Sequence, residues 1–271
     1  MSRRVEWGRS PGLQAGDGEY VEPYAGGAAI ALEVLLHEYV THIYINDVSP
    51  LIHSFWWSVL NQTDELARLV SDTKLTVSEW DRQKKVLSRP GDHDRLALGF
   101  ATFFLNRTNR SGILNGGIIG GRDQTGPWKI DARFNASELV TRITAIARMR
   151  QRISLTRRDA LRFLVSGSRK WPKKTLVYLD PPYYLKGREL YHDFYQAEDH
   201  AKVAAFVTGG CLPQHWIVSY DNVKEIRRLY AGTRHVTYDI GYSARSARTG
   251  SEVMLFADDL KVPHGLGSIR R

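Results

Sequence analysis

Residues 19–28 read Glu-Tyr-Val-Glu-Pro-Tyr-Ala-Gly-Gly-Ala, a short apolar strand that runs into a glycine turn. The next stretch, 28–36, has the character of a helix. A second apolar run at 41–45 leads into Asn46-Asp47 and a helix-like stretch whose Trp56 and Trp57 are expected in the core. A third run, 175–179, ends at Asp180. Strand, sharp turn, helix and strand in this order predict an α/β fold with a parallel sheet.

The part of the chain from Gln62 to Asn135 has a different character. It is polar, and prolines and paired glycines interrupt it. Helical pieces are expected at 77–87 and 94–105, followed by a glycine-rich loop. An amphipathic helix resumes at 137–152. We therefore predict a mostly helical insertion within a larger α/β domain.

The elements after the third apolar run complete the larger domain. We expect a helix at 197–208, a strand at 215–220, a short helix at 223–230, and a closing hairpin formed by 236–240 and 252–256. The predicted domains are one catalytic domain made of residues 1–60 and 136–271, and an insertion made of residues 61–135.

The composition excludes several classes of protein. Of 271 residues, 42% are hydrophobic and 25% are charged, which suits one large soluble domain with a smaller insertion. No apolar run is long enough for a transmembrane helix, and the first residues lack an apolar signal core. The single cysteine, Cys211, excludes a disulfide framework, and the nine histidines lack ligand spacing. We expect a cytoplasmic protein without a metal or a membrane partner.

The positive charge is concentrated in one segment. The net charge of the chain is +9, and residues 142–174 contain eleven Lys or Arg against one acid, Asp159. Concentrated basic charge suits a polyanionic partner, because each neutralised phosphate releases counterions. A solvated helix face is the alternative interpretation of such a run taken alone.

The sequence Asp180-Pro181-Pro182-Tyr183 is suited to holding an amino group. The exocyclic amino nitrogen of a purine is a poor nucleophile because its lone pair is delocalised into the ring, so it needs acceptors for both N–H bonds. Asp180 offers a carboxylate, and the prolines offer rigid carbonyls without competing N–H donors. Tyr183 offers a flat face on which an extruded base can stack. A plain turn after a strand is the alternative.

The glycine turn suits a bound ligand. A glycine turn after a first strand lets the backbone approach a ligand closely at a helix N-terminus. Asp47 ends the next apolar run, 21 residues after Gly26, where an acid can bind ribose hydroxyls. No Gly-x-Gly-x-x-Gly occurs here, which argues against a dinucleotide. Without Asp47, a plain strand–helix turn would be the favoured explanation of the two glycines.

Together these elements resemble the Dam-like family of DNA adenine methyltransferases, over most of the chain. In that family a glycine turn cradles the methyl donor, an acid after the second strand binds the donor's ribose, and Asp-Pro-Pro-Tyr holds the target adenine. The corresponding residues are Pro23, Tyr24, Ala25, Gly26, Gly27 and Ala28 for the turn, Asp47 for the acid, and Asp180, Pro181, Pro182 and Tyr183 for the clamp, with Asp180 also close to the donor. Further family-like phrases follow in family order at Phe104–Arg107, Ser111-Gly112, Arg133–Asn135, Tyr184–Gly187, Asp199-His200 and Ser219–Asn222.

The resemblance implies a Rossmann-like methyltransferase sheet with an inserted, mostly helical target-recognition domain. It also implies S-adenosylmethionine as the donor and double-stranded DNA as the substrate. Asp159 would either approach the adenine ring of the donor or pair with a neighbouring arginine. Candidates for reading base edges in the major groove are Arg107, Arg110 and Asn115, and candidates for phosphate contacts are Arg157 and Arg158.

The opening motif of the family is the main departure. Relatives begin with a Trp-x-Gly-Gly-Lys-like motif that touches the donor, whereas Trp7-Gly8-Arg9 matches it only in part and at a different distance from Pro23. This predicts weaker donor binding than in a complete relative, unless another basic residue such as Arg9 takes the role.

Three functions are consistent with the sequence. The first is a DNA adenine methyltransferase of a bacterial or phage-infected cell, with a restriction endonuclease as partner if it belongs to a restriction–modification system. The second is an amino-methyltransferase that acts on cytosine, RNA or a glutamine side chain. The third is a catalytically weak DNA-binding module. The order of the motifs and the basic segment favour the first.

Overall fold

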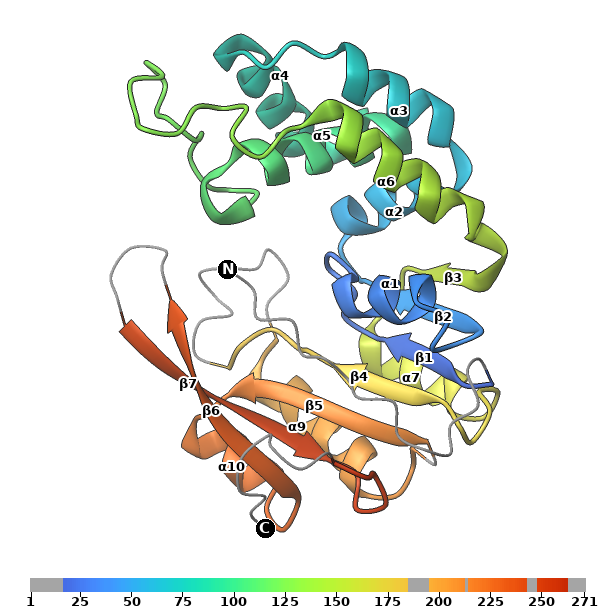
Figure 1. Ribbon diagram of the computed structural model, residues 1–271. Helices are drawn as coiled ribbons and strands as arrows, with labels where there is room; N and C mark the ends of the chain where they lie inside the picture. The colour runs from blue at the N-terminus through green and yellow to red at the C-terminus, as the bar shows by residue number, and fades with distance from the viewer. Residues whose placement is uncertain (1–16, 185–194, 213, 243–247, 263–271) are drawn as a thin grey trace.

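The computed structural model describes residues 17–184, 195–212, 214–242 and 248–262 (Figure 1). Within these ranges, seven strands form one sheet: β1 (Glu19–Glu22), β2 (His42–Asn46), β3 (Ile153–Thr156), β4 (Leu176–Leu179), β5 (His215–Asp221), β6 (Arg234–Tyr242) and β7 (Arg248–Phe256). Their order across the sheet is β3-β2-β1-β4-β5-β7-β6.

Of these seven strands, only β7 runs against the others. Strands β1 to β5 pair in parallel, and β7 pairs antiparallel with both β5 and β6. A dinucleotide-binding sheet continues directly from its fifth strand to its sixth, whereas here β7 inserts between them. The topology confirms the predicted fold class, an α/β fold with a mostly parallel, Rossmann-like sheet that a mostly helical insertion interrupts.

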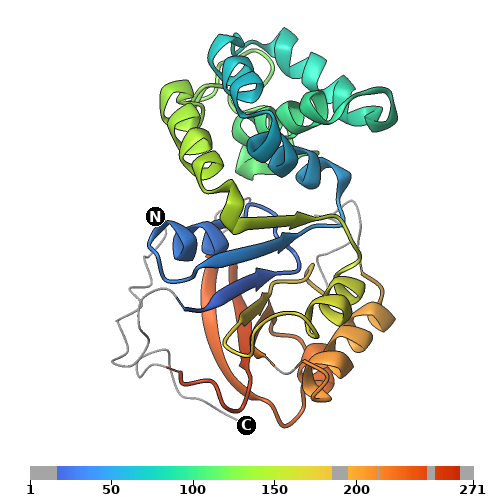
Figure 2. The ribbon, with the colours of Figure 1, turned by 90° about the vertical axis from the view of Figure 1, so that its right-hand side faces the viewer.

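Helices cover both faces of the sheet, as the apolar character of its strands requires. Successive residues of β1 point to opposite faces, so Tyr20 joins the core under α1 (Ala29–Leu36) while Val21 joins the core under α7 (Ala160–Gly167). Two more helices, α9 (Ala197–Thr208) and α10 (Lys224–Leu229), share the face of α7. Figure 2 shows α1 on one side of the sheet and these three helices on the other.

A helical segment connects β2 to β3 and stands above the sheet in Figure 1. Its helices are α2 (Pro50–Asn61), α3 (Thr63–Asp72), α4 (Val77–Ser88), α5 (Arg95–Thr108) and α6 (Ala136–Arg148), with 3-10 turns at Pro90–Asp92, Arg110–Gly112 and Arg150–Arg152. The segment therefore begins in α2 and ends in α6. No helix in the described ranges is long and apolar enough to cross a membrane.

Two details of this segment differ from the sequence-based expectation. Helix α3 lies in a stretch whose polar surface residues concealed its apolar stripe, of which Leu66 and Val70 are fully buried. The helix expected to reach Arg152 ends instead at Arg148. Arg152 lies in the 3-10 turn that follows the helix, where its guanidinium donates to the carbonyls of Val40 and Thr41.

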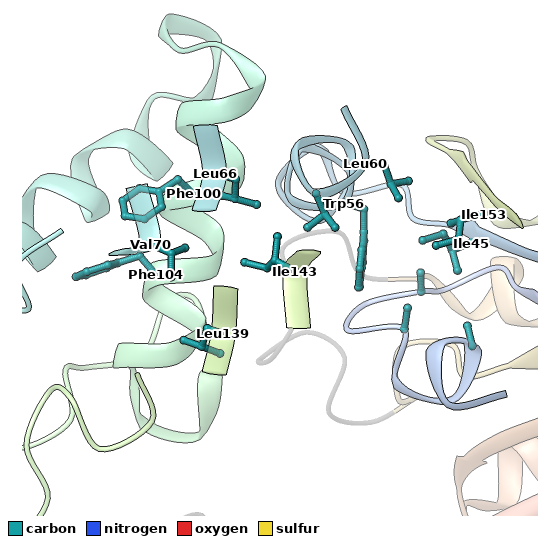
Figure 3. Packing of buried hydrophobic residues seen from close by; sticks show 14 of the residues in the cluster. Ile45, Trp56, Leu60, Leu66, Val70, Phe100, Phe104, Leu139, Ile143 and Ile153 are labelled. Atoms are coloured by element: carbon teal, nitrogen blue, oxygen red, sulfur yellow. The ribbon is translucent and has the colours of Figure 1, made fainter. Parts of the chain in front are cut away.

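One hydrophobic cluster joins the helical segment to the sheet. Ile45 and Ile153 of the sheet pack with Trp56 of α2, and Figure 3 shows Ile143 of α6 between this group and the interior of the segment. The interior contains Leu66, Val70, Phe100, Phe104 and Leu139. Because each fully buried side chain of this size contributes about 1.5–3 kcal/mol, the shared cluster fixes how the segment sits on the sheet.

Candidate functional site

The strand order brings the predicted motifs to one edge of the sheet. β1 pairs with β2 on one side and with β4 on the other, and the order of the strands reverses between β1 and β4. Ligands of open α/β sheets bind outside the carboxyl ends of the strands at such a reversal. The glycine turn follows β1, Asp47 follows β2 and Asp180 follows β4, so all three lie at this reversal.

Asp47 holds the glycine turn in place. Its Oδ2 accepts the N–H of Gly26 at 2.9 Å, and its Oδ1 accepts the N–H of Ser49 at 2.9 Å. On the other side of the turn, Trp56 donates its indole N–H to the carbonyl oxygen of Gly26 at 2.9 Å. Trp56 is buried as predicted, and it has this second role, which the sequence did not reveal.

The turn leaves room for a ligand. A Cβ atom added at Gly26 or Gly27 would meet no atom of the described residues within 4 Å, its chain neighbours apart. Gly26 and Ala28 both have a φ of 46°, a left-handed conformation that glycine adopts readily and alanine adopts at a cost. Open space over a backbone turn, with the carboxylate of Asp47 beside it, fits a donor that contains a nucleoside.

Asn46, the last residue of β2, connects the loop after β1 with the loop after β3, and sequence reasoning missed it. Its side chain is fully buried. Its Nδ2 donates to the carbonyls of Pro23 and Arg158, each at 2.9 Å, while its Oδ1 accepts the Thr156 hydroxyl at 2.8 Å and the Arg158 N–H at 3.0 Å. The only signal in the sequence was a polar residue directly before Asp47.

Glu22 lies beneath the donor turn. It is 4% exposed, and its Oε1 accepts the Tyr20 hydroxyl and the N–H of Ala31, in the first turn of α1, each at 3.0 Å. Burial raises the pKa of Glu22 to about 7, against the opposing effect of the two hydrogen bonds. The negative charge of Asp180 adds to the increase in this pKa.

Asp180 directly follows β4 and is held by the next strand. The hydroxyl of Ser219, on β5, donates to its Oδ1 at 2.8 Å, and the hydroxyls of Ser219 and Tyr178 are hydrogen-bonded at 2.9 Å. The surrounding protein raises the pKa of Asp180 by desolvation, and the carboxylate of Glu252 raises it further, while the Ser219 hydrogen bond opposes both.

The rest of the clamp is also fixed from β5 and β7. Pro181 is buried, whereas Pro182 and Tyr183 are half-buried. The Tyr183 hydroxyl donates to Oε1 of Glu252 at 2.5 Å. The N–H of Tyr184, the first residue after the clamp, donates to Oδ1 of Asp221 at 2.9 Å. The family-like residues Leu185, Lys186 and Gly187 lie outside the described residues, as does the partial opening motif Trp7-Gly8-Arg9.

Tyr24, predicted in the donor turn, belongs to an aromatic group. Its hydroxyl donates to the hydroxyl of Tyr195 at 2.9 Å, and the two rings meet edge to face. Tyr195 in turn packs against His200, a buried histidine whose Nδ1 is hydrogen-bonded to the Tyr220 hydroxyl at 2.9 Å. Burial lowers the pKa of His200, which suits a structural role for this side chain.

Asp159 lies at the same edge of the sheet, after β3. Its Oδ1 accepts the N–H of Arg162 at 3.0 Å and thereby caps the first turn of α7. This cap explains the residue locally. Because β3 is the neighbour of β2, Asp159 is one strand further from the reversal than Asp47.

Two of the predicted base-reading residues lie in an exposed loop of the helical segment. Arg110 and Asn115 are exposed, and a hydrogen bond from Arg110 N–H to the Gly117 carbonyl closes the loop at 2.9 Å. Asn109, fully buried, supports the loop from inside. Its Nδ2 donates to two loop carbonyls, and its Oδ1 accepts the indole N–H of Trp80 at 2.6 Å.

Arg107 has a different environment from its two partners in the prediction. It is half-buried in the last turn of α5. Burial lowers the pKa of Arg107, and the neighbouring charges of Arg133 and Arg142 lower it further.

The basic segment 142–174 does not lie on one surface, because β3 runs through it. Arg157 and Arg158 are exposed after the carboxyl end of β3, at the edge that carries the motifs. Arg152 precedes β3 and forms an ion pair with Glu38 at 2.9 Å. At the other end of the segment, Lys174 pairs with Asp17 before β4. In the described part of the chain, no three His, Cys, Asp or Glu side chains gather as metal ligands would.

Known proteins resemble this chain only distantly. No protein-family model and no curated protein matches the sequence. Among solved structures, the rRNA methyltransferase AviRa from Streptomyces viridochromogenes is 14% identical, with 90% of this chain and 78% of that chain covered and a TM-score of 0.37. A second structure of AviRa is 15% identical with a TM-score of 0.36. A conserved hypothetical protein from Streptococcus pyogenes is 12% identical, with 92% of both chains covered and a TM-score of 0.35. At these TM-scores the likenesses carry no argument about the site.

Proposed function

We propose that this protein is an S-adenosylmethionine-dependent methyltransferase that methylates the 6-amino nitrogen of adenine in double-stranded DNA. One observation carries the proposal. The carboxylate of Asp180 begins an Asp-Pro-Pro-Tyr clamp at the end of β4, directly across the reversal of the sheet from the open turn at Gly26. A methyl donor and an amino acceptor held at these two places would be neighbours.

The residues after β1 and β2 would hold the donor. S-adenosylmethionine supplies an electrophilic methyl group on a sulfonium sulfur. The backbone of Pro23–Ala28 can approach it closely because two positions of the turn have no Cβ. The Asp47 carboxylate would accept the ribose hydroxyls, and Asn46 fixes the loops on either side. Asp159 remains a candidate for contacting the donor's adenine ring.

The residues after β4 would hold the acceptor. The target adenine must leave the duplex, because its amino nitrogen is inaccessible inside the stack. Tyr183 would stack on the base, while Asp180 and the carbonyl of Pro181 accept the two N–H bonds. The nitrogen–carbon bond would form as the carbon–sulfur bond of the donor breaks and leaves the thioether, and the nitrogen would release one proton to solvent. Positioning and acceptor placement, rather than a strong base, supply the acceleration.

The helical segment and the loop after β3, which contains Arg157 and Arg158, would hold the DNA. Arg110 and Asn115 are accessible for reading base edges, which makes the segment the candidate for target recognition. Arg157 and Arg158 are accessible for phosphate contacts at the same edge as the clamp. Arg107 is less suited to base reading than the other two, because it is already desolvated within the segment.

The test is to incubate the protein with labelled donor and DNA, RNA or protein, and to identify the methylated product by mass analysis. N6-methyladenine in DNA is the expected product. The proposed substrate would be wrong if the product were methylated cytosine, a methylated RNA nucleoside or methylglutamine. DNA binding without any methylated product would indicate a binding module. Asp180→Ala should abolish transfer while DNA affinity stays nearly unchanged. Asp72→Ala, which removes an exposed carboxylate on α3, is the matched control.

A further inference from the structure

A buried glutamate stands behind the clamp. Glu252 lies on β7 between two neighbours in register, Asp221 on β5 and Tyr238 on β6. It is 6% exposed. Its Oε1 accepts the Tyr183 hydroxyl at 2.5 Å, and its Oε2 accepts the Tyr238 hydroxyl at 3.0 Å. A carboxylate buried in a sheet is costly unless donors satisfy it, and here one donor, the Tyr183 hydroxyl, belongs to the clamp itself.

The same part of the sheet binds the rest of the clamp. Ser219 and Asp221 are two residues apart on β5 and so point to the same face. Ser219 donates to Asp180 at 2.8 Å, and Asp221 accepts the N–H of Tyr184 at 2.9 Å. Residues of β5 and β7 therefore hold Asp180, Tyr183 and the residue after the clamp, and Glu252 is the one that binds the Tyr183 hydroxyl.

We infer that Glu252 is a positioning residue, which orients the ring of Tyr183 for stacking before a base arrives. The inference rests on the proposed function, because it assigns the ring a base to stack on. An unanchored ring would lose conformational freedom when a base stacked on it, and that loss would weaken binding of the flipped base. An anchored ring has already undergone this loss in the folded protein.

The charge of Glu252 provides a second way to test this role, through the pH dependence of methyl transfer. Because its carboxylate contributes to the raised pKa of Asp180, replacing it with an amide lowers that pKa. If transfer needs Asp180 ionised, the acid limb of the pH–rate profile then moves to lower pH. The other groups that face Asp180 keep their places in such a variant; they are Tyr20 and Glu22 on β1, Tyr178 on β4, Tyr220 on β5 and Tyr238 on β6.

The experiment is a double-mutant cycle with Tyr183→Phe, which removes only the hydroxyl, and Glu252→Ala. Methylation is measured in single turnovers, and 2-aminopurine at the target position reports stacking by its fluorescence. Each variant should transfer methyl at least about tenfold more slowly, the effect of one hydrogen bond to a charged group. Each should also give a brighter complex than the wild type. The combined variant should be no worse than either alone, because both remove the same contact.

Three further variants complete the experiment. Glu252→Gln keeps an acceptor for Tyr183 and keeps the shape of the strand, so it should transfer normally at pH 8 and show the shifted acid limb. Tyr39→Phe and Glu65→Gln, both at exposed positions, are the matched controls. Wild-type rate and fluorescence in Tyr183→Phe and Glu252→Ala, or losses that multiply in the combined variant, would overturn the role of Glu252 alone. A wild type that methylates no nucleic acid would overturn the proposed function and this role with it.

Discussion

Replacing Glu22 with glutamine should change how the stability of the protein depends on pH. Both hydrogen bonds to this side chain, from the Tyr20 hydroxyl and the Ala31 N–H, end on the single oxygen Oε1. The carbonyl oxygen of a glutamine can accept both. Glu22→Gln therefore removes the titrating charge while leaving the local structure in place, and it isolates the effect of the raised pKa.

The size of the effect follows from the two pKa values. Glu22 titrates at about 7 in the folded protein, against the usual value of 4.5. Between these values the folded state holds a proton that the unfolded chain has released, so stability falls as pH rises. At 1.36 kcal/mol per pKa unit, the total loss is about 3 kcal/mol. Roughly 2.5 kcal/mol of it falls between pH 5 and pH 8.

The assay is urea unfolding of the wild type and of Glu22→Gln at pH 5 and pH 8. The free energy of unfolding of the variant, relative to the wild type, should rise by about 2.5 kcal/mol between the two pH values. Glu65→Gln, at an exposed position on α3, is the matched control. A difference between variant and wild type that is equal at both pH values, or that moves the other way, would refute the reasoning.

Four other outcomes test the rest of the site. Asp47→Ala should weaken donor binding by about 1.5–3 kcal/mol, and unchanged affinity in calorimetry would remove Asp47 from the donor site. Asn46→Ala leaves Pro23, Thr156 and Arg158 without their hydrogen-bond partner and should cost roughly 2–4 kcal/mol of stability in urea unfolding; a loss under 1 kcal/mol would contradict the role assigned to it. Replacing Arg157 and Arg158 with alanine should flatten the salt dependence of DNA binding by up to about two units of slope and leave the methylated sequence unchanged. Arg110→Ala should relax the methylated sequence by about 1–3 kcal/mol at one base, as sequencing of methylated sites would show.

Local patterns were enough to predict where the motifs lie. The apolar runs before the glycine turn, Asp47 and Asp180 are strands, and parallel strands expose their carboxyl ends at one edge, so the three motifs had to meet. The turn chemistry at Gly26 and the clamp at Asp180 are also local, since each needs only its own short sequence. A few consecutive residues are therefore sufficient to predict each of these features.

The partners of the motifs could not be predicted, because they depend on which distant strands pair. Glu252 meets Tyr183 across 69 residues only because β7 inserts beside β5, and nothing near Glu252 in the sequence distinguishes it from a surface strand residue. Asn46 reaches Arg158 across 112 residues because β2 pairs with β3. The basic segment was misleading in the opposite way, since charges that are close in sequence, such as Arg152 and Arg157, lie at opposite ends of β3.

The two halves of the proposed reaction are supported from different parts of the molecule. The donor turn is held by Asn46 and Asp47 from β2 and by Trp56 from α2, the first helix of the segment proposed to recognise DNA. The clamp is held from β5 and β7 by Ser219 and Glu252. Trp56 packs in the cluster shared with the helical segment and also donates a hydrogen bond to Gly26. A shift of that segment on the sheet would therefore displace the donor turn more directly than the clamp. DNA bound by the segment would thus influence the donor turn more directly than the residues that hold the flipped base.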